Sequence, residues 1–398
     1  MRILTVTTFF PSQVFPYRTV FVKHIVRAMQ QFCTLDVIAP VPYAPPVPQL
    51  PRWYARSRVA LKETIDGIEV LHPRYLVIPK MDWLSGFSYF LGVLSSLRRA
   101  KDERGSVFVH AHCAYPDGVG VALAARCLRL PYAITAHGSD INVYAAKFLL
   151  RPQVRWALAG ANAVIAVSND LELKIGVMIG NADVPIARIP CAGFDPSMFF
   201  PRSQNESRKA LGFTEGTRIV VFVGNLVPVK GLDFLVQAWA MLMQRGTICT
   251  QDRLIIIGDG PCRSDLERRI ARTGTAGTTR LTGPIPQAMV SDWIAASTLL
   301  CLPSHTEGMP NVVVEAFAMG VPVVASKVGG IPELLSEGVN GLMVEPGNAA
   351  ALADALAAAL QRSWDRTRIC QSVAHLTWAA LAARNCTFLE STLTSSFV

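Results

Sequence analysis

Two glutamates stand in an E-x7-E spacing in the segment EGMPNVVVEAFAMG, Glu307 in a loop and Glu315 in an expected helix. Pro310 fixes its own φ and lacks an N–H group, so the helix is expected to begin near Asn311. The first backbone N–H groups of that helix and its positive dipole end would favour an anion. Helical side chains lean toward the N-terminus, which would aim the Glu315 carboxylate at the anion. Because a phosphate repels a carboxylate, Glu315 is better suited to accept hydrogen bonds from hydroxyl groups, and a sugar joined to a phosphate supplies both.

A lysine follows another apolar run in the same half of the chain. Lys230 lies in the loop between the expected strand Ile219–Gly224 and the next helix. A flexible cation at the carboxyl end of a strand can cover a diphosphate as a point charge. A lone loop lysine is usually just solvated, but this position favours the phosphate role.

Three histidines stand at strand ends in the first half of the chain. His137 and Asp140 lie just beyond the expected strand Tyr132–Ala136. His137 could hydrogen-bond sugar hydroxyls or stabilise a developing charge, and a purely structural role is an equal alternative. His110 and His112 end the preceding strand, and no third ligand is spaced to complete a metal site with them. They are interpreted as structural or acceptor-side residues.

Short β-branched runs alternate with helical patterns along the whole chain, which predicts an α/β protein with two doubly wound parallel sheets. In such sheets ligands bind at the carboxyl ends of the strands, here in a cleft between two domains. The expected strands of the first half are Ile3–Thr8, Leu35–Ala39, Val107–Ala111, Tyr132–Ala136, Ala163–Val167 and Ala187–Pro190. Those of the second half are Ile219–Gly224, Leu254–Gly258, Arg280–Gly283, Leu299–Leu302, Pro322–Ser326 and Gly341–Val344.

The domain boundary is expected in a polar stretch. We predict an N-terminal domain over residues 1–199, a linker over 200–216, a C-terminal domain over 217–375, and a helical tail over 376–398 that packs back on the N-terminal domain. The stretch Trp83–Leu97 is apolar on most sides and is followed by Arg98, Arg99, Lys101 and Arg104. It could be an amphipathic surface helix, but a helix packed on the N-terminal sheet is favoured, because such sheets need covering helices.

The charge of the chain is concentrated in its first half. Residues 1–200 hold 21 Lys and Arg against 13 Asp and Glu, whereas residues 201–398 hold 17 against 16. This bias suits an anionic acceptor or membrane surface, and scattered solubilising charge is an equal explanation. The nine cysteines include no C-x-x-C pair, which indicates reduced thiols in a cytoplasmic protein. No run reaches the roughly 18 apolar residues of a membrane span, so a soluble or peripheral protein is expected.

Several motifs together resemble the retaining nucleotide-sugar glycosyltransferases of family 4, which have the two-domain GT-B architecture. In chain order they are Lys230–Gly231, the Glu307/Glu315 pair with its GMPN loop, VGGIPE and NGLMVEPG, preceded by PCAGFDPSMFFP near residues 190–201. The match runs over nearly the whole chain, and the E-x7-E segment is its most specific part. The wording HAHCAYPDG and TAHGSDIN is similar to members that build bacterial envelope or exported polysaccharides.

The resemblance implies roles for matching positions. Glu315 would bind the donor ribose, Lys230 would cover the diphosphate, and His137 would sit by the transferred sugar near the reacting carbon. Glu307 and the backbone amides of Met309 to Val312 would hold the donor sugar and diphosphate, in a donor-binding loop that comprises Gly308, Met309, Pro310, Asn311 and Val312. The base would lie against the loop after Arg280–Gly283, which brings in Gly283.

The chain departs from the family pattern at two places. Many members carry an arginine where this chain has Asn225, which removes one diphosphate cation. The first-domain loop is often Gly-Gly, but here Tyr17, Arg18 and Thr19 occupy it, and we expect Arg18 to supply the lost charge.

The predicted function is therefore transfer of a sugar, with retention, from a nucleotide-sugar donor (uridine being the commoner base) to a saccharide or lipid-linked acceptor for surface polysaccharide. No metal or other cofactor is expected, because no Asp-x-Asp pair stands at a strand end. No nucleic-acid partner is expected, and the basic N-terminal domain would contact the cytoplasmic face of the inner membrane. Two alternatives remain: a GT-B-type sugar-nucleotide epimerase, and a non-catalytic sugar-nucleotide-binding partner of an assembly complex.

Overall fold

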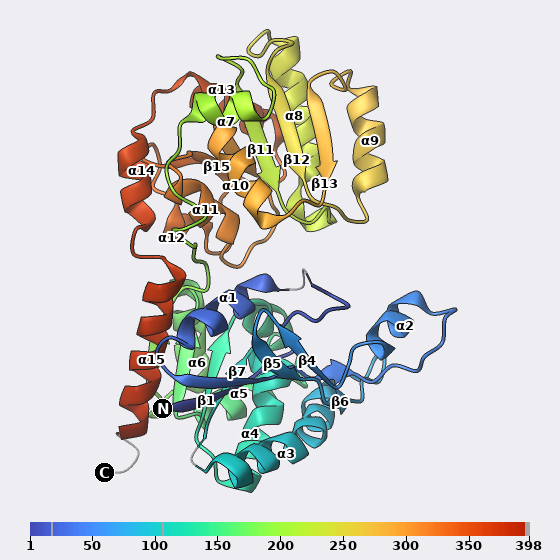
Figure 1. Cartoon of the computed structure of the whole chain (residues 1–398), viewed down its shortest axis with the longest axis vertical. Coiled ribbons are helices and arrows are strands. Elements are labelled where there is room, and N and C mark those ends of the chain that lie inside the picture. The colour runs from blue at the N-terminus through green and yellow to red at the C-terminus, as the bar shows by residue number, and fades with distance from the viewer. Residues whose placement is uncertain (17–18, 106, 395–398) are drawn as a thin grey trace. The chain divides into compact units, whose positions relative to one another are not determined.

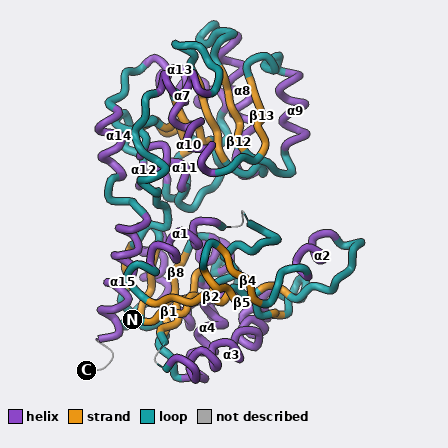
Figure 2. Tube along the Cα trace, in the orientation of Figure 1, coloured by secondary structure: helices purple, strands orange, loops and turns teal. Residues whose placement is uncertain are grey.

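The computed structural model describes residues 1–16, 19–105 and 107–394, and it divides into two compact units (Figure 1). Unit 1 runs from Met1 to Cys191 and also includes the C-terminal segment from Trp378, and unit 2 is Ala192–Thr377. Figure 2 shows strands gathered inside each unit with helices around them. Each unit is thus a layered α/β body with its own core.

Unit 1 is built on an eight-stranded sheet of order β10-β9-β8-β7-β1-β2-β5-β4. All its pairs are parallel except β4 with β5. The central strands are buried along their whole length, as expected of a parallel sheet covered on both faces. The strands are β1 Arg2–Val6, β2 Thr34–Ile38, β4 Lys62–Ile65, β5 Ile68–Leu71, β7 Phe108–His112, β8 Tyr132–Ala136, β9 Ala163–Ala166 and β10 Ile186–Arg188.

The main helices of unit 1 are α1 Val20–Met29, α2 Pro51–Ser57, α3 Ser85–Arg104, α4 Val119–Leu128, α5 Arg151–Ala159, α6 Asn169–Ile179 and α15 Trp378–Thr394. Three short helical turns complete the unit: η1 Asp82–Leu84 before α3, η2 Ala114–Gly118 after β7 and η3 Asp140–Tyr144 after β8. Helix α15 packs along α1, where the rings of His24 and Trp378 stack 5.4 Å apart. The C-terminal tail is therefore part of unit 1.

Unit 2 is built on a six-stranded, all-parallel sheet of order β13-β12-β11-β14-β15-β16. Its strands are β11 Ile219–Val223, β12 Arg253–Ile257, β13 Thr279–Gly283, β14 Leu299–Leu302, β15 Val323–Ser326 and β16 Gly341–Val344. Its helices are α7 Gln204–Ala210, α8 Leu232–Gln244, α9 Arg263–Arg272, α10 Gln287–Ala296, α11 Asn311–Ala318, α12 Ile331–Leu334, α13 Ala349–Gln361 and α14 Arg366–Val373, with the 3-10 turn η4 Pro228–Lys230.

The predicted α/β class and the two doubly wound sheets are confirmed, and all twelve expected strands are present within one or two residues of their predicted ends. The hairpin β4–β5 was not predicted, so the first sheet is not wholly parallel. Its strands are short and half-exposed, and its turn places Asp66 and Gly67 at φ 48° and 84°. Such a D-G hairpin turn is a local signal that the search for apolar runs overlooks. Strands β3 Val41–Pro42 and β6 Arg74–Tyr75 form a separate two-stranded parallel sheet.

The predicted linker over residues 200–216 is wrong, because this stretch belongs to unit 2 and contains α7. The buried Arg208 of α7 donates to the Ala296 carbonyl at 3.0 Å and to Thr298 Oγ1 at 2.9 Å, which fastens the stretch to α10 and β14. The chain changes unit at Cys191/Ala192 and again at Thr377/Trp378. The polar composition of this stretch reflects a largely exposed helix and not a flexible linker.

In each sheet the strand order reverses between two adjacent strands. The loops that follow the carboxyl ends of these two strands are distant in sequence but close in space. In unit 2 the reversal lies between β11 and β14, so the loops carrying Lys230 and Glu307 become neighbours. In unit 1 it lies between β1 and β7, and β7 pairs in turn with β8, the strand that His137 follows. Among the described residues no helix is both long and apolar enough to cross a bilayer.

The chain just after β12 lies so close to the chain just after β11 that only a glycine fits at position 258. A Cβ atom on Gly258, which has φ +134°, would lie 1.9 Å from the Gly224 carbonyl oxygen. Gly258→Ala should therefore lower the free energy of unfolding by about 1–3 kcal/mol, measured by urea unfolding. Gly277→Ala is the matched control, since its Cβ would meet nothing within 4 Å. Equal stability of the two variants would contradict the crowding.

Candidate active site

Lys230 and Glu307 meet at the carboxyl edge of the second sheet. Lys230 Nζ lies 2.6 Å from Glu307 Oε1, and the Ser304 hydroxyl donates to the same oxygen at 2.6 Å. The Glu307 side chain is 9% exposed and that of Lys230 21%. The ion pair is thus largely shielded from water, which strengthens its electrostatic attraction, and Lys230 keeps enough exposed surface to contact a ligand. Sequence reasoning placed both residues in the donor site but did not predict that they bind each other.

Backbone contacts hold the two loops in this register. The Val229 carbonyl accepts from the His305 N–H at 2.7 Å. A Cβ atom on Gly231, which has φ +61°, would lie 2.1 Å from the Pro303 carbonyl oxygen, so the turn after Lys230 needs a glycine. Gly330 donates its N–H to the Gly308 carbonyl at 2.7 Å, which ties the VGGIPE segment to the GMPN loop. The motifs of this unit therefore meet around one loop.

Helix α11 begins at Asn311, as predicted, and Pro310 before it makes no side-chain cap. The uncapped start leaves the positive end of the helix dipole to a ligand. Met309 is buried beneath the loop, while Asn311 and Val312 are half-buried at the helix start. Asn311 Oδ1 is buried without a hydrogen-bond partner among the described residues. A buried oxygen of this kind is ready to accept from a ligand hydroxyl or water.

Glu315 is buried one turn inside α11, on the side of Gln287. Gln287 Nε2 lies 3.4 Å from Glu315 Oε1, and burial raises the pKa of the carboxyl to about 7, which the hydrogen bond from Gln287 opposes. A carboxyl that has lost its water in this way gains when ligand hydroxyl groups donate to it. Gln287 starts α10 in the loop after β13, and sequence reasoning missed it. Its only signal was its place after the strand expected to face the base.

In unit 1, His137 lies at the end of β8 in an aromatic surrounding. The Phe9 and Phe21 rings pack against it with centroids 5.9 and 5.2 Å away, and His137 Nε2 lies 3.3 Å from His112 Nδ1. Burial lowers the pKa of His137 to about 4, against the opposing effect of Asp140. His137 Nδ1 has no partner within the described part of the chain. The ring is thus neutral at pH 7, with one nitrogen free to donate to or accept from a ligand.

The other two histidines line up behind His137. The His110 and His112 rings lie 4.3 Å apart, and His110 Nε2 lies 2.7 Å from Thr135 Oγ1. Both are buried, and burial lowers the pKa of each, that of His110 to about 3. Among the described residues no group of three His, Cys, Asp or Glu side chains could hold a metal ion.

Asp140 positions the loop that carries His137. It is buried and accepts from four backbone N–H groups, those of Ala114, His137, Gly138 and Ile141, at 2.7 to 3.3 Å. Ala114 follows β7, so this one carboxylate joins the loops after β7 and β8. Asp140 is therefore a positioning residue, which spacing could not show.

The remaining predicted site residues are spread over the same edges. Asn225 is exposed at the end of β11, and Gly283 is buried at the end of β13, where its carbonyl accepts from the Gly258 N–H at 3.0 Å. Arg18, expected to replace the cation missing at Asn225, lies outside the described residues. The roles of all these residues stay predictions.

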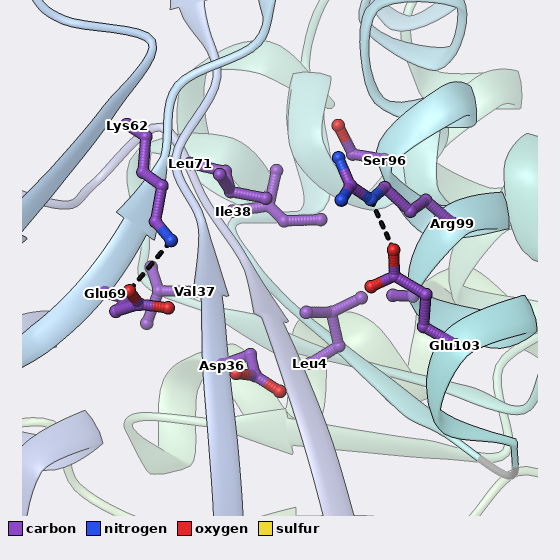
Figure 3. Close-up of a pocket in the computed structure, with 11 residues that line it drawn as sticks. Leu4, Asp36, Val37, Ile38, Lys62, Glu69, Leu71, Ser96, Arg99 and Glu103 are labelled. Carbon is purple, nitrogen blue, oxygen red and sulfur yellow. Dashed lines mark hydrogen bonds and ion pairs between the residues drawn. The ribbon is translucent and has the colours of Figure 1, made fainter.

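A separate pocket of about 200 Å³ lies between α3 and the strands β1, β2 and β5 (Figure 3). Its cations are already paired, Lys62 with Glu69 at 2.8 Å and Arg99 with Glu103 at 2.6 Å. None of the predicted site residues lines it. A pocket whose charges neutralise each other is poorly suited to a diphosphate.

Comparison with known families divides the chain as the fold does. A family model described as glycosyl transferases group 1 matches residues 217–362. A model described as glycosyltransferase family 4 matches residues 19–192.

Two relatives are similar over most of their length. TuaC of Bacillus subtilis (strain 168), which is named as a teichuronic acid biosynthesis glycosyltransferase, is 32% identical over 364 residues. The alignment covers 89% of this chain and 88% of TuaC. The alpha-D-kanosaminyltransferase of Streptomyces kanamyceticus is 30% identical over 312 residues, which is 74% of this chain and 78% of that enzyme.

Solved structures share the fold at lower identity. Anabaena Alr3699/HepE in complex with UDP superposes with a TM-score of 0.72 at 20% identity, covering 98% of this chain and 100% of that one. Sucrose-phosphate synthase of Thermosynechococcus elongatus gives 0.73 at 18% identity, covering 99% of this chain and 100% of that one.

The raised pKa of Glu315 makes the stability of the empty protein depend on pH. The folded pKa, about 7, exceeds the ordinary value of 4.5, so the folded state keeps a proton that the unfolded chain has lost. The free energy of unfolding should therefore fall as the pH rises from about 4.5 to about 7. Glu315→Gln should remove this loss, and its free energy of unfolding should exceed that of the parent by about 3 kcal/mol near pH 8, with no gain below about pH 4.5.

Urea unfolding across this pH range measures the effect. Glu345→Gln, at an exposed position of the same unit, is the control and should leave the pH profile of the parent unchanged. A Glu315→Gln difference of the same size at low and high pH would show that the carboxyl does not titrate as stated.

Proposed function

Because the chain belongs to the group 1 glycosyltransferases of family 4, we propose that it moves a sugar from a nucleotide-sugar donor to a saccharide or lipid-linked acceptor with retention of configuration. Its class as a glycosyltransferase rests on the two family models and on relatives that are glycosyltransferases by name. The predicted GT-B architecture is confirmed by the two Rossmann-like sheets and by structural neighbours that cover nearly the whole chain.

The observation that carries the proposal is the convergence of Lys230 and Glu307 with the uncapped start of α11. We assign the donor diphosphate to the first N–H groups of that helix, with Lys230 as its mobile cation. Glu307 holds Lys230 at 2.6 Å, which positions the cation for a ligand. Once the diphosphate shares Lys230, the Glu307 carboxylate is able to accept from hydroxyl groups of the donor sugar.

The same groups stabilise the departure of the diphosphate. Negative charge grows on the leaving oxygen as the bond to the sugar breaks, and a fixed helix end with a nearby cation stabilises it without reorganising. The anomeric carbon becomes oxocarbenium-like, as in glycoside hydrolysis. We assign contact with the transferred sugar to His137, whose neutral ring is able to hydrogen-bond a hydroxyl. No metal is assigned to this step, because cationic and dipolar protein groups supply the positive charge.

The ribose is assigned to Glu315, and the base to the loop between Gly283 and Gln287. A carboxyl already desolvated by burial gains when ribose hydroxyl groups donate to it, and it binds them best when ionised. We propose uridine as the base, since a structural neighbour was solved with UDP. Surface polysaccharide is the proposed product class, in line with the name of TuaC. We also propose that the enzyme works in the cytoplasm at the membrane face, with its basic N-terminal half toward the lipid.

Thermal shift with nucleotide sugars tests the donor site. A UDP-sugar at 100 times its dissociation constant should stabilise the protein by about 2.7 kcal/mol. Lys230→Met should weaken binding by about ten- to a hundredfold, since it removes a charge-assisted contact and leaves Glu307 facing the phosphate unpaired. Lys230→Arg should keep most of the affinity, and Lys209→Met, at an exposed position on α7, should keep all of it.

Radiolabelled sugar transfer then separates the enzyme from a binding protein. The parent should release UDP and label an acceptor, whereas Glu307→Gln should bind the donor and transfer little. Unchanged donor binding by Lys230→Met would remove Lys230 from the phosphate site, and donor turnover without any acceptor would favour an epimerase.

A further inference from the structure

Large apolar side chains are exposed on three neighbouring segments of unit 1. The first segment is η1 with the start of α3, the second is η3 with the loop before α5, and the third is α6 (Figure 1). Phe148 is 89% exposed and Val177 82%. We call this surface the apolar belt, and its members are Trp83, Phe87, Leu91, Val143, Phe148, Leu149, Leu173 and Val177.

Helix α3 contributes to the belt with a second apolar face. Tyr89, Val93 and Leu97 are buried in the core of unit 1, on the side of α3 that packs along α4. Phe87 and Leu91 repeat at four-residue spacing, in line with Trp83, and are 53% and 56% exposed. Packing within unit 1 therefore accounts for one side of α3 and leaves the other apolar side toward solvent.

Hydrogen bonds join the three segments into one surface. Gln153 Nε2 donates to the Trp83 and Leu149 carbonyls, each at 3.1 Å, which holds the first segment against the second. Lys174 Nζ donates to Asn142 Oδ1 at 2.8 Å, which holds the second against the third. A groove of about 510 Å³ follows this second junction, lined by Ala146, Arg151, Leu173 and Val177 among others. The three segments thus lie side by side, and apolar side chains gathered on neighbouring exposed segments usually mark an interaction site.

Cations predominate around the belt. Lys147 and Lys174 are exposed on the second and third segments, and Lys80 just before η1 and Arg151 and Arg155 on α5 are exposed next to them. Apart from the buried Asp140, the acidic residues of the three segments are Asp82, Asp170 and Glu172, and the first two already pair with Lys147 at 2.7 Å and Lys174 at 2.6 Å. An apolar surface carrying Trp, Phe and Leu and edged by Lys and Arg matches the interface of an anionic lipid bilayer.

We propose that the apolar belt of unit 1 seats the enzyme on an anionic membrane, with Trp83, Phe148 and Val177 entering the lipid interface and Arg151 and Arg155 binding lipid phosphates. This deepens the proposed function and rests on it for the nature of the acceptor. The second segment begins at Asp140, which also holds the backbone of His137. A lipid-linked acceptor in the bilayer would therefore have its head group beside the strand end that carries His137.

Charge argues for lipid over a second copy of the chain. A two-fold contact would set the same surface on both partners, so the cations of one belt would face those of the other. An anionic bilayer meets the same cations with opposite charge and takes up the apolar side chains without matched cavities. Membrane binding also needs no spanning helix.

Vesicle sedimentation with the full chain tests the proposal. The parent should bind vesicles of equimolar phosphatidylcholine and phosphatidylglycerol at least tenfold more tightly than vesicles of phosphatidylcholine alone. Phe148→Ser with Val177→Ser should weaken binding to the anionic vesicles about tenfold or more. Arg151→Gln with Arg155→Gln should weaken it about tenfold and should reduce its salt dependence.

Matched controls place the effect on the belt. Leu61→Ser removes an exposed leucine next to β4, at the opposite end of the sheet from β9 and β10, and should leave vesicle binding unchanged. Arg268→Gln with Arg272→Gln removes two charges from α9 of unit 2 and should do the same. All variants should keep the thermal shift with UDP-sugar, so loss of that shift in the parent would count against the proposed function and not against the belt.

Two outcomes would overturn the proposal. The first is a parent protein that binds its donor but does not bind anionic vesicles, or that binds them as tightly as the belt variants do. The other is self-association in sedimentation velocity that Phe148→Ser abolishes while vesicle binding persists, which would assign the belt to a contact between copies of the chain.

Discussion

Parallel strands all end at one edge of their sheet, and where the strand order reverses the loops that leave this edge on either side come together. In unit 2 this constraint brings the loop after β11 against the loop after β14. Lys230 and Glu307 are 77 positions apart in sequence and 2.6 Å apart in space because of it. The uncapped start of α11 lies at the end of the same loop, so cation, carboxylate and helix dipole are combined by topology alone.

Burial then sets the chemistry of each group at this edge. Glu315 loses water without gaining a cation, and its pKa rises to about 7 as a result. Glu307 is as little exposed but has Lys230 and Ser304 as partners. Two glutamates of the same helix-and-loop segment therefore suit different ligand groups. One is held by a cation that a diphosphate could share, and the other is ready for hydroxyl groups.

Unit 1 uses buried polar groups to hold its strand-end loops. Asp140 joins the loops after β7 and β8 through backbone N–H groups, and Asp117 accepts from the Thr8 backbone N–H at 2.7 Å, which joins the loops after β1 and β7. The neutral histidines fill the space behind His137 without adding charge. The outer side of the same unit is different, because its exposed apolar belt is explained by no contact within the described chain.

The sequence by itself determined the α/β class, the twelve main strands and the start of α11 at Asn311, because each follows from local patterns of β-branched runs, glycine and proline. It also indicated which side chains stand at strand ends. Tertiary structure alone decided that Lys230 binds Glu307 and that Gln287 reaches Glu315, since these contacts join separate segments. It also decided that Asp140 accepts hydrogen bonds from the backbone of the loops after β7 and β8. It decided too that residues 200–216 pack within unit 2 and that α3 keeps an apolar side exposed. Composition and periodicity report how apolar a segment is, whereas what covers each face depends on neighbours that are distant in sequence.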